Sequence, residues 1–298
     1  MKNRISHNSP YAWWLAMRPK TLTGAAIPVM LAGGWAYHEG CFDLWPWLCC
    51  LGFACMMQVT ANFINDLYDF LRGSDREDRL GPERACAQGW ITPSAMRIGI
   101  VVAIVVACLV GLAAIALCYD RLPWMGLEYV ALGVLCILFA FLYTTCLSYL
   151  GLGDILVLVF FGFVPVAGTW YLMQQTLPAE VWLLGAISGI SIDALLAINN
   201  YRDRDQDRLS GKKTLVVRLG ERFGSMHYLA TGLIAAGLIC PLGTFCLPVV
   251  PLYLILHCTT WKKMVRIHEG RALNMILGET SRNMFLMALL LSALLCWR

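Results

Sequence analysis

Spaced carboxylates follow an apolar stretch in the sequence Asn62-Phe63-Ile64-Asn65-Asp66-Leu67-Tyr68-Asp69, and Asp75 and Asp78 come soon after. A second segment of this kind reads Asn199-Asn200-Tyr201-Arg202-Asp203-Arg204-Asp205-Gln206-Asp207 and follows another apolar stretch. Each apolar stretch is long enough to cross a membrane, since a spanning helix needs about 20 mostly apolar residues. Acidic clusters at the ends of two membrane helices indicate a site for a metal-bound phosphate at the boundary between water and lipid.

The composition of the chain is that of an integral membrane protein. Of its 298 residues, 59% are hydrophobic and 14% are charged, whereas soluble proteins carry about 25% charged residues. The net charge of +4 does not indicate nucleic acid, because the basic residues lie in short loops where membrane orientation explains them. The thirteen cysteines lie mostly inside apolar runs, which favours small buried side chains over a disulfide or metal framework.

The hydropathy pattern predicts an all-α membrane protein with nine transmembrane helices around a central cavity. A single membrane-embedded domain is expected to cover residues 1–298, with two cytoplasmic motif loops at about 66–95 and 200–225. The nine predicted spans are 21–38, 46–67, 96–118, 124–145, 153–174, 180–200, 226–243, 245–261 and 282–297.

The distribution of basic residues supports this count. With nine spans, the N-terminus and the even-numbered loops share one side, and of the 23 Lys and Arg residues only Arg121 and Arg298 fall on the other. The positive-inside rule then places the N-terminus and both acidic segments in the cytoplasm and the C-terminus outside. The two acidic segments also sit at similar places in the two halves of the chain, which suggests two similar halves facing one another across a cavity.

Helical spacing gives each acidic segment one face of possible ligands. Positions three, four and seven apart share a helix face, and the residues that fit are Asn62, Asn65, Asp66, Asp69, Asn199, Asp203 and Asp207. Such clusters repel one another unless a cation neutralises them. Oxygen ligands without His or Cys favour Mg²⁺, which is typically held by one or two carboxylates together with substrate phosphates. Interleaved Arg and Lys residues would bind the remaining phosphate charge.

The chain resembles the UbiA superfamily of membrane prenyltransferases over nearly its full length. Asn65-Asp66-Leu67-Tyr68-Asp69 resembles the first Asp-rich motif of that superfamily, and the segment from Asn199 to Asp207 resembles the second. Where many members have a further Asp four positions on, this chain has Gly73, with Asp75 two positions later. The resemblance implies Mg²⁺ bound by Asn65, Asp66, Asp69, Asp75, Asp203 and Asp207.

Several separate blocks resemble the branch of the superfamily that prenylates 1,4-dihydroxy-2-naphthoate for menaquinone biosynthesis. These blocks are Arg18-Pro19-Lys20-Thr21, Gly73-Ser74-Asp75, Asp78-Arg79-Leu80-Gly81-Pro82 with Arg84, Gly151-Leu152-Gly153-Asp154, and Gly211 to Gly220. This resemblance implies transfer of a polyprenyl group from polyprenyl diphosphate to the naphthoate, with loss of diphosphate and CO₂, in the inner membrane of the cell.

The resemblance also implies substrate-binding roles, for residues within the second motif and for residues outside both motifs. The expected substrate-binding residues are Arg18, Lys20, Asn62, Arg79, Arg84, Asp154, Asn199, Arg202 and Lys212. Ordinary membrane anchoring explains Arg18 and Lys20 equally well, and helix N-capping explains Asp154 equally well. Tyr143 is expected near the allylic carbon, where its ring would stabilise a cation, although an interfacial aromatic is the alternative.

The sequence is also consistent with two other functions. The same fold could prenylate 4-hydroxybenzoate, homogentisate or haem, because acceptor shape is determined by scattered cavity residues. A transporter would also combine polar membrane residues with repeated halves. A transporter would place its polar groups near the middle of the helices, whereas here the carboxylates gather on one side.

Overall fold

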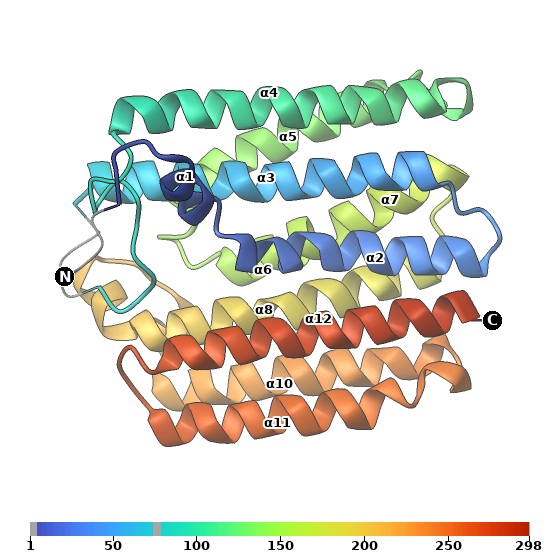
Figure 1. The fold of residues 1–298 in the computed structure, drawn as a ribbon. Helices are drawn as coiled ribbons and strands as arrows, with labels where there is room; N and C mark the ends of the chain where they lie inside the picture. Colours follow the sequence, from blue (N-terminus) through green and yellow to red (C-terminus); the bar gives the residue numbers. More distant parts are fainter. Residues whose placement is uncertain (1–4, 74–78, 298) are drawn as a thin grey trace.

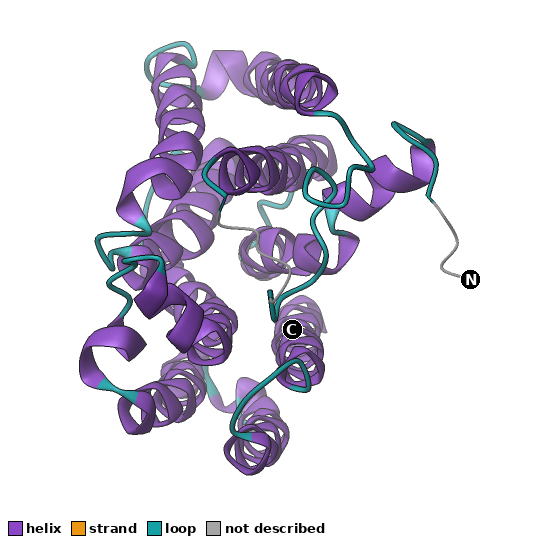
Figure 2. Ribbon diagram, turned by 90° about the vertical axis from the view of Figure 1, so that its left-hand side faces the viewer, coloured by secondary structure: helices purple, strands orange, loops and turns teal. Residues whose placement is uncertain are grey.

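The computed structural model describes residues 5–73 and 79–297, and in this part every regular element is a helix (Figure 2). The α-helices are α1 (Pro10–Met17), α2 (Leu22–His38), α3 (Leu44–Leu71), α4 (Pro93–Cys118), α5 (Leu127–Leu142), α6 (Gly153–Leu158), α7 (Val164–Gln174), α8 (Ala179–Leu209), α9 (Leu215–Leu219), α10 (Glu221–Ile239), α11 (Val249–Ile267) and α12 (Leu273–Trp297). Single π-helical turns, η3 (Tyr143–Leu147) and η4 (Val159–Phe163), connect α5 to the following loop and α6 to α7. The remaining elements are short 3₁₀ turns: η1 (Pro19–Thr21), η2 (Tyr119–Arg121), η5 (Cys240–Leu242) and η6 (Thr244–Cys246). The predicted all-α class is confirmed.

The long helices lie side by side in one bundle (Figure 1). The N-terminus and the last turns of α3, α8 and α11 lie at one end, and the C-terminus lies at the other (Figure 1). Both acidic segments therefore reach the same end of the bundle, as the charge distribution predicts. We call this the motif end.

Eight helical segments of the described residues are long and apolar enough to cross a membrane, so the protein is a multi-pass membrane protein. The remaining predicted span, 21–38, corresponds to α2, which has 17 residues. At about 1.5 Å per residue, α2 is a little shorter than a hydrocarbon core of about 30 Å. It lies beside α3 and α12 and reaches the end of the bundle where the C-terminus lies (Figure 1).

Apolar side chains cover the outside of the bundle as well as its core. The outward face of α4 exposes Ile98, Val101, Val105, Leu109 and Leu112. A row of exposed aliphatic residues this long is unfavourable in water and suits contact with lipid chains. The largest core cluster joins α2, α7, α8, α10, α11 and α12, and among its residues are Trp35, Trp170, Ile187, Ile239 and Leu291.

A glycine contact brings the backbone of α8 against the π-helical turn η4. A Cβ atom added to Gly162 would lie 2.5 Å from the carbonyl oxygen of Gly185 and 3.0 Å from the Cα of Gly189. Small residues allow such close backbone approach between membrane helices, where packing rather than the hydrophobic effect drives association. The chain from α6 to α7 is therefore held firmly against α8.

The two helices that carry the acidic segments, α3 and α8, are longer than hydropathy predicts. The expected spans end at residues 67 and 200, but α3 continues to Leu71 and α8 continues to Leu209. The motif carboxylates consequently lie on the last helical turns rather than on loops. Helical spacing thus holds each set of ligand side chains in a fixed arrangement.

Candidate active site

A polar cavity of about 510 Å³ opens at the motif end, where α3 and α8 finish. It brings together most of the residues predicted as a site. The predicted residues that line it are Arg18, Asn65, Asp69, Arg79, Arg84, Tyr143, Asp154, Asn199, Arg202, Asp203, Asp207 and Lys212. Carboxylates and cations from widely separated parts of the sequence therefore share one space.

Two residues of the first segment face this cavity from α3. The carboxylate of Asp69 is buried, and its Oδ2 accepts a hydrogen bond from the Arg84 guanidinium at 2.7 Å. The side-chain oxygen of Asn65 accepts a hydrogen bond from the Thr144 hydroxyl of η3. Each side chain thus connects α3 to another wall of the cavity.

Asp66 has a different environment from Asp69. Its carboxylate is 1% exposed and does not line the cavity. Oδ2 accepts the backbone amide of Ala85 at 2.9 Å, and Oδ1 accepts that of Cys86 at 2.8 Å. The nearest cation, Arg18, lies 4.0 Å from Oδ2. Asp66 therefore anchors the loop that carries Arg84, and a role as metal ligand stays a prediction.

Three other predicted residues are placed outside the cavity wall or outside the described part of the chain. Asn62 is buried, and its amide donates to the carbonyl of Met17 and to the hydroxyl of Thr21, both at 2.9 Å. Lys20 is exposed and does not line the cavity. Asp75 lies outside the described residues. For Asn62 the contacts indicate a structural link between α3 and the start of α2.

The α8 side of the cavity carries two carboxylates, each with a neighbouring cation. Arg202 donates from Nε and one terminal nitrogen to the two oxygens of Asp203, at 2.7 and 2.6 Å. A third bond, to Asn274 of α12 at 2.7 Å, fixes the guanidinium. A carboxylate has about four acceptor positions, so Asp203 can still bind a cation. The ammonium of Lys212 lies 3.7 Å from Asp207.

Arg18 approaches the cavity from the connection between α1 and α2. Burial and the neighbouring guanidinium of Arg84 lower its pKa from the ordinary value, while Asp66 and Asp69 act in the opposite direction. Crowded guanidinium groups are costly unless an anion joins them. The cavity therefore favours a multiply charged anion between the two sets of carboxylates.

The loop after η3 closes one wall of the cavity and is fastened to the segment before α9. Lys213 donates its backbone amide to Tyr149 at 3.1 Å, and Arg218 donates to the carbonyl of Leu150 at 3.0 Å. Gly151 has φ +78°, and a Cβ there would lie 2.2 Å from the carbonyl oxygen of Lys213. Both the backbone conformation and the space require glycine.

Replacing Gly151 by alanine should separate these two segments. We expect Gly151→Ala to lower the free energy of unfolding by roughly 1–3 kcal/mol and to reduce turnover, because Tyr143 and Lys212 flank the displaced segments. Thermal unfolding of the purified protein in detergent and steady-state turnover measure the two effects. Gly133→Ala, where an added methyl group meets nothing within 4 Å, is the control. Equal melting temperatures for the two variants would contradict the argument.

The cavity also contains residues that the sequence did not single out for the site. Arg72 donates to the carbonyls of Thr144 and Thr145 at 3.0 and 2.6 Å and lies over the Tyr149 ring. Lys212 lies over the same ring, 5.5 Å from its centre. In the sequence Arg72 counted only toward membrane orientation, and no spacing pattern linked it to Tyr149.

The capping alternative for Asp154 is wrong, since Leu152 is the N-cap of α6.

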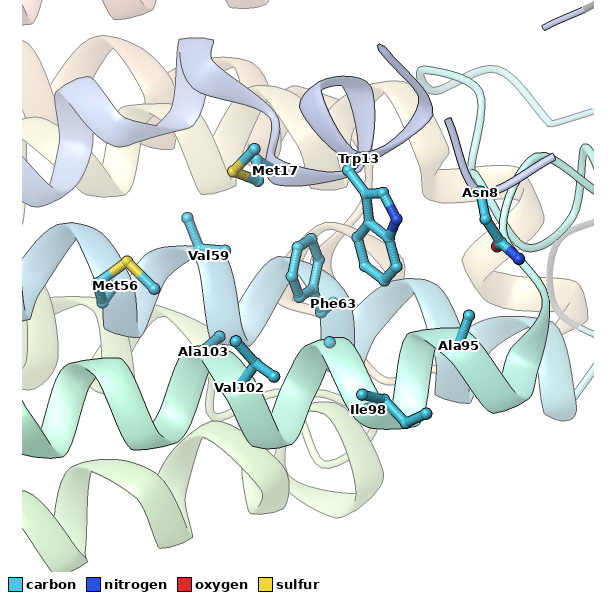
Figure 3. Close-up of a pocket in the computed structure, with 11 residues that line it drawn as sticks. Asn8, Trp13, Met17, Met56, Val59, Phe63, Ala95, Ile98, Val102 and Ala103 are labelled. Carbon is cyan, nitrogen blue, oxygen red and sulfur yellow. The ribbon is translucent and has the colours of Figure 1, made fainter. Parts of the chain in front are cut away.

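A second hollow, of about 460 Å³, lies between α1, α3 and α4 and is distinct from the polar cavity (Figure 3). Its wall is apolar except at Asn8, and the side chains of Trp13, Met56, Phe63 and Val102 point toward it. This hollow offers no charged side chain to a phosphate group. The polar cavity is therefore the candidate active site.

The oxygen donors of the polar cavity fit Mg²⁺. Asn65 and Asp69 from α3 and Asp203 and Asp207 from α8 all line it. Among the described residues, neither His nor Cys lines this cavity, so the donor set is the hard, oxygen-only type that Mg²⁺ prefers. The neighbouring guanidinium and ammonium groups leave room for substrate phosphates to complete the coordination.

A helical membrane bundle with carboxylates and cations gathered in a cavity at one end fits a membrane enzyme that acts on a phosphorylated substrate. The sequence pattern of the UbiA prenyltransferase family matches residues 25–289. The chain belongs to this family.

Similar proteins agree with this assignment. The chain is 41% identical to 1,4-dihydroxy-2-naphthoate octaprenyltransferase of Escherichia coli (strain K12), over 70% of this chain and 69% of that protein. It is 33% identical to the protein of the same name from Mycobacterium leprae (strain TN), over 77% and 76% of the two chains. A solved structure of a UbiA homologue from Archaeoglobus fulgidus, bound to DMAPP and Mg²⁺, superposes with a TM-score of 0.58 at 12% identity, covering 94% of this chain and 99% of that one. The likeness to that structure supports the fold.

Proposed function

We propose that this protein transfers a polyprenyl group from polyprenyl diphosphate to 1,4-dihydroxy-2-naphthoate, with loss of diphosphate and CO₂, to give demethylmenaquinone. The observation that carries the proposal is the polar cavity, in which carboxylates of α3 and α8 face one another among several cations at one end of a membrane bundle. The names of the relatives from Escherichia coli and Mycobacterium leprae support the naphthoate as acceptor.

The carboxylates are proposed to hold the metal that binds the diphosphate. Asp69, Asp203 and Asp207, with the amide oxygen of Asn65, are the ligands that line the cavity. Bound Mg²⁺ would neutralise the charge that develops on the leaving diphosphate. Asp66 would act by holding the Arg84 loop, in addition to any direct contact with metal.

The cations around the carboxylates are proposed to bind the diphosphate oxygens. Arg84 and Arg202 are fixed by hydrogen bonds to Asp69 and Asp203, so their guanidinium groups are already oriented. Such preorganised charges stabilise developing charge without the cost of reorganisation. The ring of Tyr143, at the first residue of η3, lines the same space and would stabilise cationic character at the allylic carbon.

The placement of the cavity at one end of the bundle suits substrates of mixed polarity. The diphosphate and the naphthoate carboxylate would lie among the charges at the motif end, while the polyprenyl tail extends along apolar helix faces into lipid. We propose that the motif end faces the cytoplasm and that the protein resides in the inner membrane of the cell, because the basic residues gather at this end.

Incubating the purified protein with labelled polyprenyl diphosphate and each acceptor in turn tests the proposal. We expect prenylated product and CO₂ with 1,4-dihydroxy-2-naphthoate, and at least a hundredfold less product with 4-hydroxybenzoate or homogentisate. Turnover should stop in excess EDTA and return when Mg²⁺ is added. Preference for another acceptor would reject the naphthoate, and full turnover in EDTA would reject the role of the metal. Solute uptake by proteoliposomes without diphosphate release would indicate a transporter instead.

A further inference from the structure

A histidine and two carboxylates, one buried and one half-buried, cluster next to the polar cavity, and neither Asp-rich motif includes any of the three. Asp154 is in the first turn of α6, Asp193 is in the middle of α8 and His227 is on α10. Ligand atoms of the three side chains lie within 4.8 Å of one another. Asp193 is 7% exposed, and α8 packs against both α6 and α10.

The two ring nitrogens of His227 face different carboxylates. Nε2 lies 3.0 Å from Oδ2 of Asp193, and Nδ1 lies 3.8 Å from Oδ1 of Asp154. A single metal ion would need one ring nitrogen directed toward both carboxylates at once. An imidazolium with a proton on each nitrogen fits this arrangement instead, because Nε2 can donate to Asp193 while Nδ1 lies within ion-pair distance of Asp154.

Further acceptor capacity remains in the cluster. Oδ1 of Asp193 and Oδ1 of Asp154 are buried, and neither accepts a hydrogen bond from the described residues. A buried carboxylate oxygen without a donor is costly. When His227 is an imidazolium and both carboxylates are ionised, the cluster carries a net charge of −1. This charge becomes zero when one carboxylate takes up a proton. Uptake of a proton is therefore favoured in this poorly solvated region.

Only one member of the cluster reaches the substrate space. Asp154 lines the polar cavity, whereas Asp193 and His227 lie behind it. A Cβ on Gly153, the neighbouring residue, would be 3.9 Å from the Tyr143 hydroxyl. Asp154 therefore shares the cavity with the tyrosine that we place at the allylic carbon, where the acceptor ring must also lie for the new bond to form.

We propose that Asp154, His227 and Asp193 form a proton relay, in which Asp154 takes the proton of the acceptor hydroxyl next to the carbon that is prenylated. This inference rests on the proposed function. His227 and Asp193 are positioning residues: Asp193 holds the imidazolium, and the imidazolium orients Asp154 and stabilises its charge.

The relay accounts for every proton and electron pair in the transfer. The O–H bond of the acceptor breaks and its proton goes to Asp154, while the electron pair forms the new C–C bond through the ring. The allylic C–O bond breaks, and its pair leaves with the diphosphate. Loss of CO₂ from the same ring carbon then returns a pair to the oxygen, which takes the proton back from Asp154. The relay ends in its starting state.

Other titratable groups share the cavity with Asp154, among them Asp69, Asp203, Asp207 and Lys212. Among the carboxylates whose charge acts on the Tyr143 hydroxyl, Asp154 and Asp193 act most strongly, and Asp207 and Asp69 follow. On α10, the ring of Phe223 lies tilted against that of His227, with centroids 5.7 Å apart. To assign a pH dependence of the rate to one group, variants of the relay are therefore compared with variants of these other groups.

The test is the pH dependence of single-turnover prenyl transfer with saturating Mg²⁺ and polyprenyl diphosphate, under anaerobic conditions. For Asp154→Asn we expect a rate at pH 7 about 100-fold below wild type, the usual scale of a lost general base. The rate of this variant should rise about tenfold per pH unit, because a phenolic hydroxyl ionises unaided toward about pH 10. Wild type should change little between about pH 7 and 9.

Variants of the positioning residues complete the test. His227→Gln and Asp193→Asn should show the same recovery at high pH with a smaller loss, about tenfold at pH 7. His268→Gln, a half-exposed histidine that pairs with Glu221 outside the cavity, is the control and should keep the wild-type profile. Binding of polyprenyl diphosphate and Mg²⁺ should be equal in all variants, which shows that the fold is intact.

Three results would overturn the relay. One is wild-type turnover by Asp154→Asn at pH 7, and another is a loss that high pH does not restore although diphosphate binding is normal. The third is one equivalent of zinc, manganese or iron bound to wild type and lost in His227→Gln, which would make the cluster a metal site. Absence of naphthoate prenylation by wild type would reject the proposed function itself, so the two failures are distinguishable.

Discussion

Asp203→Asn should reduce prenyl transfer by about 100- to 1000-fold, the range seen when a group that stabilises developing charge is removed. The amide keeps the shape of the side chain but removes the negative charge that faces the cavity and its acceptor sites for Mg²⁺. It also frees the guanidinium of Arg202, whose two bonds to Asp203 measure 2.7 and 2.6 Å. Product formation at saturating substrate, measured over a Mg²⁺ titration, checks both the maximum rate and the metal requirement.

Asp205 supplies a matched control from the same segment of α8. Its side chain is 69% exposed, pairs with Arg208 at 3.5 Å and does not line the cavity. Asp205→Asn should therefore retain wild-type turnover and the same Mg²⁺ dependence. Equal losses for the two variants would mean that the charge of the segment as a whole matters rather than the carboxylate in the cavity.

Asp66→Ala should impair both stability and turnover. The change leaves the buried amides of Ala85 and Cys86 without their acceptor, and a hydrogen bond to a charged group contributes about 1.5–3 kcal/mol. We expect a loss of roughly 3 kcal/mol in the free energy of unfolding and at least a hundredfold loss in turnover, because the loop that carries Arg84 is released. Thermal unfolding and the rate of tryptic cleavage after Arg84 report on the loop independently of activity.

A surface carboxylate at the other end of the bundle provides the comparison for Asp66. Asp120→Ala, in an exposed turn after α4, should leave the melting temperature, the tryptic pattern and the turnover unchanged. If Asp66→Ala loses activity while the loop stays protected and the melting temperature holds, Asp66 acts as a metal ligand alone. The anchoring role would then be wrong.

Much of this architecture could be predicted from the sequence. Long apolar runs and the one-sided basic residues indicate the class of protein and bring both acidic segments to one end. The helix ends could not be predicted from hydropathy, because α3 and α8 continue as helices through charged residues as far as Leu71 and Leu209. Charge ends an apolar pattern but does not end a helix.

Part of the cavity was predictable from patterns along one helix, and the resemblance to a known family added residues such as Arg18, Tyr143 and Lys212. Asn65, Asp69, Asp203 and Asp207 share faces at helical spacing, and all four line the cavity. The amide partners of Asp66 come from a loop about 20 residues away, which no local spacing reveals. His227 meets Asp154 and Asp193 only through the packing of three helices, so no sequence signal linked them.

The glycine contact between α8 and the turn η4 has a consequence for motion. Helices whose backbones touch have little freedom to slide, so side chains on them keep their separations when the bundle flexes. Asp154 moves with α6 and η4, and Asp193 moves with α8. We therefore expect the distance between the two carboxylates to stay constant when substrates bind. Among the described residues, no glycine contact of this kind joins α3, which carries Asp69, to α8, which carries Asp203. Adjustment to diphosphates with different numbers of bound ions should then come from movement of α3 relative to a rigid unit of α6, α7 and α8.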